Sequence, residues 1–166
     1  MTPADDTGAT TFTTPSDREL AVTRVFDAPR ALVFDAWTRP AHIANWMLGP
    51  EGWTMPVCEV DLRSGGAWRF VWRSGDGREL RMDGVYREVS PPERMVFTEA
   101  WGGDWPLTLN TVVLAEEDGR TRLTCTVQYV STGARAAAFS TGMSEGMSQS
   151  LERLAAYLAE ARAGDQ

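Results

Sequence analysis

The sequence predicts one α+β domain, in which a curved antiparallel sheet of seven strands packs against a long C-terminal helix and two short helices follow the first strand. Three observations support this. The 166 residues are enough for one domain of ordinary size. Six β-rich segments in the middle of the chain are separated by compact turns. The final segment repeats apolar residues at helical spacing.

The chain begins with residues 1–17, which are rich in Thr, Asp and Pro. We expect this leader to be disordered, so that the domain covers residues 18–162. Glu19–Phe26 has the apolar pattern of a strand, and Asp27-Ala28-Pro29 stops it, because proline lacks the amide proton of a strand ladder but suits the first turn of a helix. Two short helices are predicted after this stop, Arg30–Thr38 and Pro40–Met47.

The central part of the chain predicts six consecutive strands joined by short turns. They are Trp53–Leu62, Ala67–Arg73, Glu79–Val89, Arg94–Trp101, Leu107–Ala115 and Thr121–Val130. Strands connected in this way form an antiparallel meander. Because side chains alternate along a strand, Trp68, Phe70 and Trp72 share one face of Ala67–Arg73, which we expect to meet the helix.

The last segment, Thr132–Ala163, predicts one long amphipathic helix. Its apolar stripe contains Phe139, Met143, Met147, Leu151, Leu154 and Leu158. Gly142 and Gly146 lie one turn apart in this segment, and glycine costs about 1 kcal/mol relative to alanine inside a helix. Either a close approach to a ligand or close packing of the helix on the sheet would account for them.

Composition excludes several kinds of chemistry. All 16 basic residues are arginine, so the chain has no lysine for a Schiff base or for a phosphate loop of the form GxxxxGK[ST]. One histidine, His42, and two separated cysteines, Cys58 and Cys125, do not suit the common zinc sites. We therefore expect no metal and no cofactor.

The net charge and the hydropathy of the chain indicate which binding partners and which cellular compartment to expect. The 23 acidic residues give a net charge of −7, which argues against a nucleic-acid partner or an anionic membrane. No stretch approaches the roughly 18 apolar residues of a membrane span, and the N-terminus lacks the pattern of a signal peptide. These features predict a cytoplasmic protein.

Four segments resemble a known family. They are RVFDAPRALVFDAWT at 24–38, WMLGP at 46–50, DLRSGG at 61–66 and GMSEGMSQSLERLAAYL at 142–158. They look like bacterial proteins related to the activator of the heat-shock-protein-90 ATPase, in the START and birch-pollen-allergen (SRPBCC) superfamily. The resemblance covers Leu20 to Leu158. It implies the helix-grip fold and a cavity for apolar molecules between helix and sheet, used in some members for catalysis.

The chain departs from this family at two aromatic positions. Relatives commonly have an aromatic after Trp46 and a tryptophan in the GMxxGW motif, where this chain has Met47 and Met147. A flexible thioether in place of an indole would change the shape of the cavity.

The main functional hypothesis is therefore binding of a small hydrophobic or aromatic ligand between the sheet and the C-terminal helix. The seven tryptophans exceed what one small core needs, although each alone could be an ordinary core residue. The predicted ligand-binding residues are Trp46, Trp53, Trp68, Phe70, Trp72, Phe97, Glu99, Trp101, Met143 and Met147.

Two alternatives remain from the sequence. Glu99 shares a strand face with Met95 and Phe97, and a carboxylate in an apolar cavity has a raised pKa. Glu99 could therefore act as the general acid or base of a cyclase or hydratase. Otherwise it forms an ion pair with Arg69 or Arg81 across the sheet. The second alternative is a chaperone accessory or the partner of a regulator. It would use the exposed aromatic loop of residues 101–105, which could instead close a homodimer.

Overall fold

The computed structural model describes residues 9–103 and 105–164, and in this part of the chain it contains an eight-stranded antiparallel sheet and four helices. The strands are β1 (Thr11–Thr13), β2 (Glu19–Phe26), β3 (Trp53–Val60), β4 (Ala67–Ser74), β5 (Glu79–Ser90), β6 (Arg94–Glu99), β7 (Thr108–Glu117) and β8 (Arg120–Gln128). The helices are α1 (Arg30–Thr38), α2 (Pro40–Ile43), α3 (Thr132–Phe139) and α4 (Met143–Gly164).

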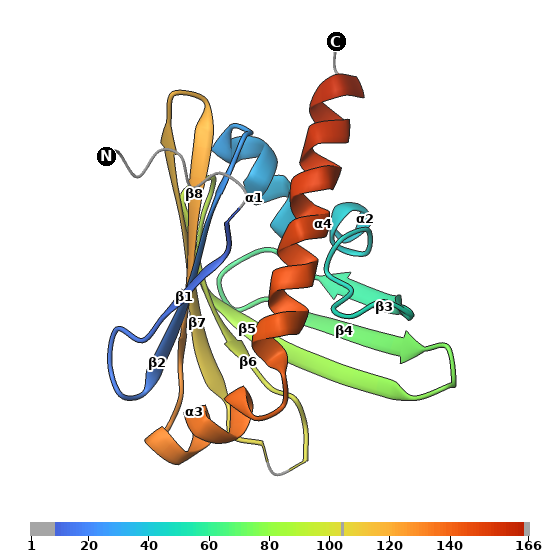
Figure 1. The fold of residues 1–166 in the computed structure, drawn as a ribbon, viewed down its shortest axis with the longest axis vertical. Coiled ribbons are helices and arrows are strands. Elements are labelled where there is room, and N and C mark those ends of the chain that lie inside the picture. Colours follow the sequence, from blue (N-terminus) through green and yellow to red (C-terminus); the bar gives the residue numbers. More distant parts are fainter. Residues whose placement is uncertain (1–8, 104, 165–166) are drawn as a thin grey trace.

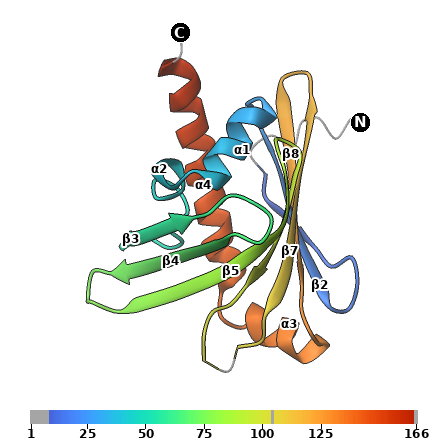
Figure 2. The ribbon, with the colours of Figure 1, turned by 180° about the vertical axis from the view of Figure 1, so that it is seen from behind.

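The sheet has the order β1-β2-β8-β7-β6-β5-β4-β3, so β3 to β8 form the expected meander and β2 closes its far end by pairing with β8. Strands β3, β4 and β5 spread away at a steep angle from the part formed by β2, β7 and β8 (Figure 1). From behind, α4 crosses the space between these two parts (Figure 2). This arrangement confirms the predicted helix-grip fold, with one strand more than the seven expected.

The additional strand, β1, corrects the expectation of a wholly disordered leader. Thr11 to Thr13 pair with Ala21 to Thr23 of β2, and Phe12 packs against the core. Threonine and phenylalanine favour a half-buried strand, and this edge of β2 would otherwise lack a partner for its backbone groups. Residues 1–8 of the predicted leader lie outside the described residues.

The predicted C-terminal helix is divided in two, which is the largest difference from the sequence-based expectation. α3 ends at Phe139, and Gly142 adopts a φ of 80° before α4 begins at Met143. A positive φ of this kind favours glycine and ends a helix. Phe139 therefore lies on α3, with 38% of its surface exposed, and not on the buried stripe of α4.

The remaining boundaries differ by a few residues. α2 ends at Ile43 and not at Met47, because the chain turns after it, and residues 44–46 form no further regular helix. β6 ends at Glu99, so Trp101 follows the strand and does not belong to it.

The core lies between the concave face of the sheet and α4. Leu151, Leu154 and Leu158 of α4 are at most 2% exposed, and they pack in one cluster with side chains of β2, α1, β4 and β8. Burial of such a leucine contributes about 2 kcal/mol. The first half of α4, from Met143 to Met147, is less buried, and there the helix and the sheet leave room between them.

Candidate functional site

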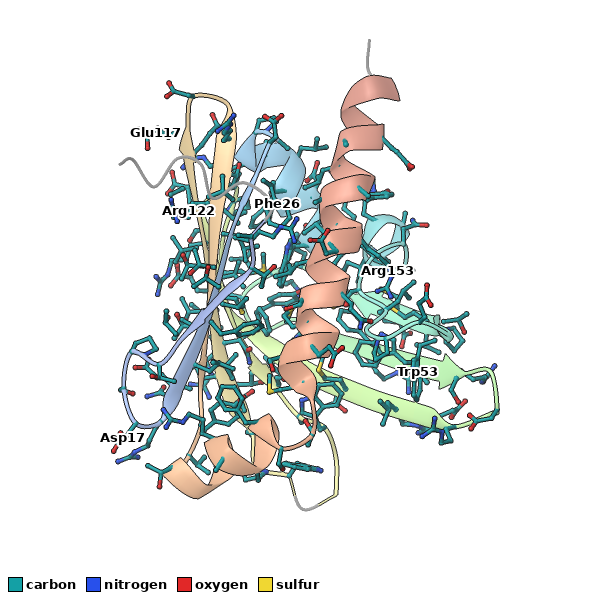
Figure 3. All side chains as sticks on the ribbon, in the orientation of Figure 1. Asp17, Phe26, Trp53, Glu117, Arg122 and Arg153 are labelled. Carbon is teal, nitrogen blue, oxygen red and sulfur yellow. The ribbon has the colours of Figure 1, made fainter. Side chains whose placement is uncertain are left out.

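A cavity of about 500 Å³ opens between the first half of α4 and the sheet. Its walls come from α1, from strands β3 to β8, from the loops of residues 47–50 and 105–107, from α3 and from the start of α4. Side chains crowd the space between α4 and the strands that fan out beside it, with Trp53 toward the β3–β4 side (Figure 3). The aromatic side chains in the lining are Trp37, Trp53, Trp68, Phe70, Trp72, Tyr86, Phe97, Trp101, Trp105 and Tyr129.

The longest aromatic wall comes from β4. Trp68, Phe70 and Trp72 alternate with outward-facing residues, and their rings follow one another at centroid distances of 4.9 and 5.8 Å. The indole Nε1 of Trp72 donates a 2.7 Å hydrogen bond to the carbonyl oxygen of Met47, which fixes the ring against the loop of residues 47–50. The wall is therefore held in place before any ligand arrives.

Gly84 of β5 creates the space that Trp68 occupies. A Cβ atom at this position would lie 1.8 Å from the carbonyl oxygen of Thr98 and 2.8 Å from Cε2 of Trp68. Both distances are shorter than van der Waals contact allows, so only glycine fits without displacing β6 or the indole.

Trp101 covers part of the cavity from the loop after β6. Its ring stacks on Trp72 with a centroid distance of 5.9 Å and an angle of 17° between the planes. The residue is nevertheless 41% exposed, and its Nε1 donates a 2.8 Å hydrogen bond to Oε1 of Glu99. Trp101 thus connects the aromatic wall with the acidic side chain of the cavity.

The opposite wall is formed by α4 and a loop attached to it. Met143 and Met147 face the cavity, and Gly146 lies between them, where a Cβ atom would sit 3.7 Å from Cδ of Pro50. The loop is tied to the helix because the amide of Gly49 donates a 2.9 Å hydrogen bond to Oγ of Ser150. The expectation of two glycines one turn apart on a helix is wrong for Gly142, which precedes α4.

Polar groups gather at one end of this apolar cavity. Thr108 of β7 is directly opposite Glu99 of β6, and Asn110 is opposite Phe97, so their side chains share the concave face. Nδ2 of Asn110 donates to Oγ1 of Thr108 at 3.0 Å. Tyr129, just after β8, completes the group and donates from its hydroxyl to Sδ of Met143 at 3.3 Å.

Glu99 is the carboxyl group of the described cavity lining. Burial raises the pKa of its carboxyl group from 4.5 to about 7, and the hydrogen bond from Trp101 opposes part of this rise. The two arginines considered as partners bind other carboxylates, since Arg69 pairs with Glu59 and Arg81 with Glu79. Glu99 is therefore a carboxyl group that can gain or lose a proton near neutral pH.

The other ionisable groups of the cavity are neutral at that pH. Burial, with a smaller contribution from Glu99, raises the pKa of the Cys125 thiol to about 12 and that of the Tyr129 hydroxyl to about 12. Burial also raises the pKa of Tyr86 above its usual range. Outside the cavity lining, burial raises the pKa of Cys58 to about 11, so neither cysteine forms the thiolate that a nucleophile requires.

All but one of the residues predicted to bind ligand line this cavity. The exception is Trp46, which is fully buried against Trp37 at a centroid distance of 5.1 Å and donates from Nε1 to the carbonyl oxygen of Ala36. Trp46 thus belongs to the core and not to the cavity, whereas Trp37 belongs to the core and also reaches the cavity wall.

Sequence reasoning missed the polar residues from β7 onward. Thr108 and Asn110 lie on β7 and Tyr129 follows β8, in segments that the sequence predicts only as β-rich strands. Their shared face with Glu99 depends on the register between β6, β7 and β8, and a one-residue shift would have moved them to the outer face.

Two other kinds of feature are absent from residues 9–103 and 105–164. No three side chains of the metal-binding types His, Cys, Asp and Glu cluster there in a way that could hold a metal ion. In the same part of the chain, no helix is both long and apolar enough to cross a bilayer.

Comparison with solved structures shows several similar proteins. A crystal structure of a Rhodobacter sphaeroides protein has 28% identity and a TM-score of 0.84, covering 91% of this chain and 98% of that one. A Chromobacterium violaceum protein has 29% identity and a TM-score of 0.73, with 84% and 96% covered. The AHSA1 protein of Silicibacter pomeroyi has 26% identity and a TM-score of 0.72, with 86% and 99% covered.

Comparison with curated proteins finds no match. A family model does match, over residues 27–159, and its description is "Activator of Hsp90 ATPase homolog 1-like protein". This range runs from the end of β2 to the last turns of α4 and so contains every element that surrounds the cavity. Together with the helix-grip architecture and the similar solved structures, the match shows that the chain belongs to this AHSA1-like family of the SRPBCC type.

Proposed function

We propose that this protein binds a small apolar or aromatic molecule in the cavity between α4 and the sheet. The observation that carries the proposal is the cavity itself, whose volume of about 500 Å³ lies within the range of small-molecule sites. Its lining is dominated by aromatic and methionine side chains, and a few polar groups converge at one end, which is the usual composition of a ligand site.

The arrangement of the rings favours a flat ligand. Trp72 and Trp101 stack nearly parallel, and a planar molecule can extend such a stack. Met143 and Met147, on the facing wall, have flexible side chains that can adjust to the outline of a ligand. The combination of a fixed aromatic wall and an adaptable thioether wall supports binding of a class of related molecules.

The experiment is a binding titration with 2-naphthylmethanol, an uncharged aromatic probe, followed by calorimetry and native mass spectrometry. Met147→Trp places an indole inside the cavity, and the expected result is at least a tenfold loss of affinity. Val113→Trp is the matched control, because Val113 lies on the outer, exposed face of β7. A probe that does not bind, or one that binds both variants equally well, would contradict the proposal.

A second candidate function, proton transfer by Glu99, is favoured by one observation. Its carboxyl group has a pKa of about 7 in an apolar cavity, which is the condition for a general acid or base at neutral pH. The carboxylate would take a proton from the carbon beside a ligand carbonyl, the electron pair of the C–H bond would move to form the enolate, and the proton would later return.

Exchange of this carbon-bound hydrogen is directly measurable. In D₂O, the methyl protons of 2-acetylnaphthalene would exchange for deuterium faster with the protein than with buffer, as followed by proton NMR. Glu99→Gln removes the base and is expected to abolish the acceleration. Equal acceleration by the variant would refute the role of Glu99, and no acceleration by either protein would leave binding as the better supported function.

Partner binding and homodimer formation through the loop of residues 101–105 stay predictions. Trp101 and Trp105 are 41% and 46% exposed, and Asp104 lies outside the described residues. Light scattering of the full chain would test the homodimer.

A further inference from the structure

The charges around the cavity determine which kind of apolar molecule it accepts. Among the described residues that line it, none is Arg or His, and the sequence contains no Lys. Glu99 is the one acidic side chain in that lining. The cavity wall described by the structure is thus either neutral or negative, depending on the protonation of Glu99.

Four of the polar donors around the cavity are already engaged. Trp72 donates to the carbonyl oxygen of Met47, and Trp101 donates to Glu99. Asn110 donates to Thr108, and the hydroxyl of Tyr129 donates to the sulfur of Met143. An anionic ligand would have to break these contacts to obtain hydrogen bonds from these four groups.

Two further indole N–H groups, those of Trp37 and Trp68, have no hydrogen-bond partner, but both nitrogens are completely buried. Neither can reach a ligand without movement of the ring. These two donors therefore do not supply an anion site, and the polar side chains that line the cavity include the carboxyl group of Glu99.

Three nearby arginines are directed elsewhere. The charge of Arg135 on α3 opposes the rise in the pKa of Tyr129 that burial causes. The Arg135 guanidinium, however, donates its hydrogen bonds to the carbonyl oxygens of Ser16 and Glu19, at 2.7 and 3.3 Å. On β4, Arg69 and Arg73 lie on the outer face and pair with Glu59 and Glu79. None of these guanidinium groups belongs to the lining.

We propose that the cavity selects aromatic molecules by charge, accepting uncharged or amine-bearing ones and rejecting carboxylates, with the amine placed against Glu99. This rests on the proposed ligand-binding function and names the class of ligand. A carboxylate in this cavity would lose its hydration without gaining a cation, and it would lie near another acidic group. A protonated amine would instead find an opposite charge in an apolar environment, where the attraction is strong.

The preference should depend on pH, because Glu99 changes charge near neutrality. The groups that face Glu99 are Thr108 and Asn110 of β7, Cys125 and Tyr129 of the β8 segment, and Trp101 of the following loop. None of them is charged at neutral pH. Affinity for an amine is therefore expected to rise with pH as Glu99 ionises, until the amine itself loses its proton.

The test uses three probes of the same shape: 2-naphthylmethylamine, 2-naphthylmethanol and 2-naphthoate. Calorimetry near pH 7.5 is expected to give an affinity for the amine about tenfold or more above that for the carboxylate. Glu99→Gln is expected to lower the amine-to-alcohol affinity ratio about fivefold or more and to remove its pH dependence. Glu117→Gln, which removes an exposed carboxylate at the end of β7, serves as the control and leaves the ratio unchanged.

The outcomes separate the two proposals. If the alcohol binds and the carboxylate binds equally well, charge selection is refuted and the cavity remains a ligand site. If the amine-to-alcohol ratio is the same in Glu99→Gln and the unmodified protein, the placement of the amine against Glu99 is wrong. If no probe binds, both the proposed function and the selection built on it fail.

Discussion

Replacement of Glu99 by glutamine should increase the stability of the protein at alkaline pH. The carboxyl group has a pKa of about 7 in the folded protein and an ordinary value of 4.5 when the chain unfolds. One unit of pKa corresponds to about 1.4 kcal/mol, so ionised Glu99 costs the folded state up to about 3 kcal/mol. Glutamine is neutral at every pH and avoids this cost.

The sign and the pH window follow from the raised pKa. The stability that protonated Glu99 contributes is fully present below about pH 4.5 and is lost as the pH rises through about 7. The difference in unfolding free energy, variant minus unmodified protein, should therefore increase by about 3 kcal/mol between these limits.

The measurement is urea denaturation of both proteins at several pH values, followed by circular dichroism. Glu117→Gln is the control for the loss of one negative charge at an exposed site. A stability difference for Glu99→Gln that stays constant between about pH 4.5 and 8 would refute the burial of Glu99 as an ionisable group.

Three other variants test separate parts of the structure. Gly84→Ala forces a Cβ atom to within 1.8 Å of the carbonyl oxygen of Thr98, and thermal unfolding should show that the free energy of unfolding falls by about 3 kcal/mol or more. The control is Gly75→Ala, where a Cβ atom meets nothing within 4 Å and the loss should be less than about 1 kcal/mol. Equal losses in the two variants would contradict the close packing at Gly84. Trp101→Phe removes the hydrogen bond that lowers the pKa of Glu99, so NMR titration should find the pKa of Glu99 above about 7, and an unchanged pKa would show that the bond is not formed. Leu151→Ala should destabilise the protein by about 2–5 kcal/mol in urea denaturation, because Leu151 is fully buried, and a loss below about 1 kcal/mol would contradict its place in the core.

The sequence predicted the sheet well because its turns are chemically distinct. Clusters of Gly, Ser, Asp and Pro separate β3 to β8, and the observed ends of these strands lie within a few residues of the predicted ones. Alternation in the predicted strand Ala67–Arg73 placed Trp68, Phe70 and Trp72 on the concave face, since each side chain on a strand points opposite to its neighbour.

The break between α3 and α4 was missed because the apolar spacing continues across it. Phe139 and Met143 are four residues apart, which is helical spacing, yet Gly142 between them has left-handed backbone geometry. The run Ser140-Thr141-Gly142 is the signal that could have indicated the break, because these residues favour turns and helix ends.

The cavity could be predicted only in part, for a different reason. Trp46 and Trp53 flank the same turn-rich loop, but one packs against Trp37 in the core and the other lines the cavity. This difference depends on how α2 and the loop after it pack against α4. No local pattern of residues in the sequence determines that packing. The pKa of Glu99 likewise depends on burial by strands that are distant in the sequence.

A crystal structure of the protein with 2-naphthylmethanol tests the central claim, a ligand site between α4 and the sheet, most directly. Density for the probe is expected among Trp68, Trp72, Met143 and Met147, with its hydroxyl group directed to the polar end at Glu99. Probe density on the outer face of the sheet, or a cavity that stays free of the probe at a saturating concentration, would contradict it.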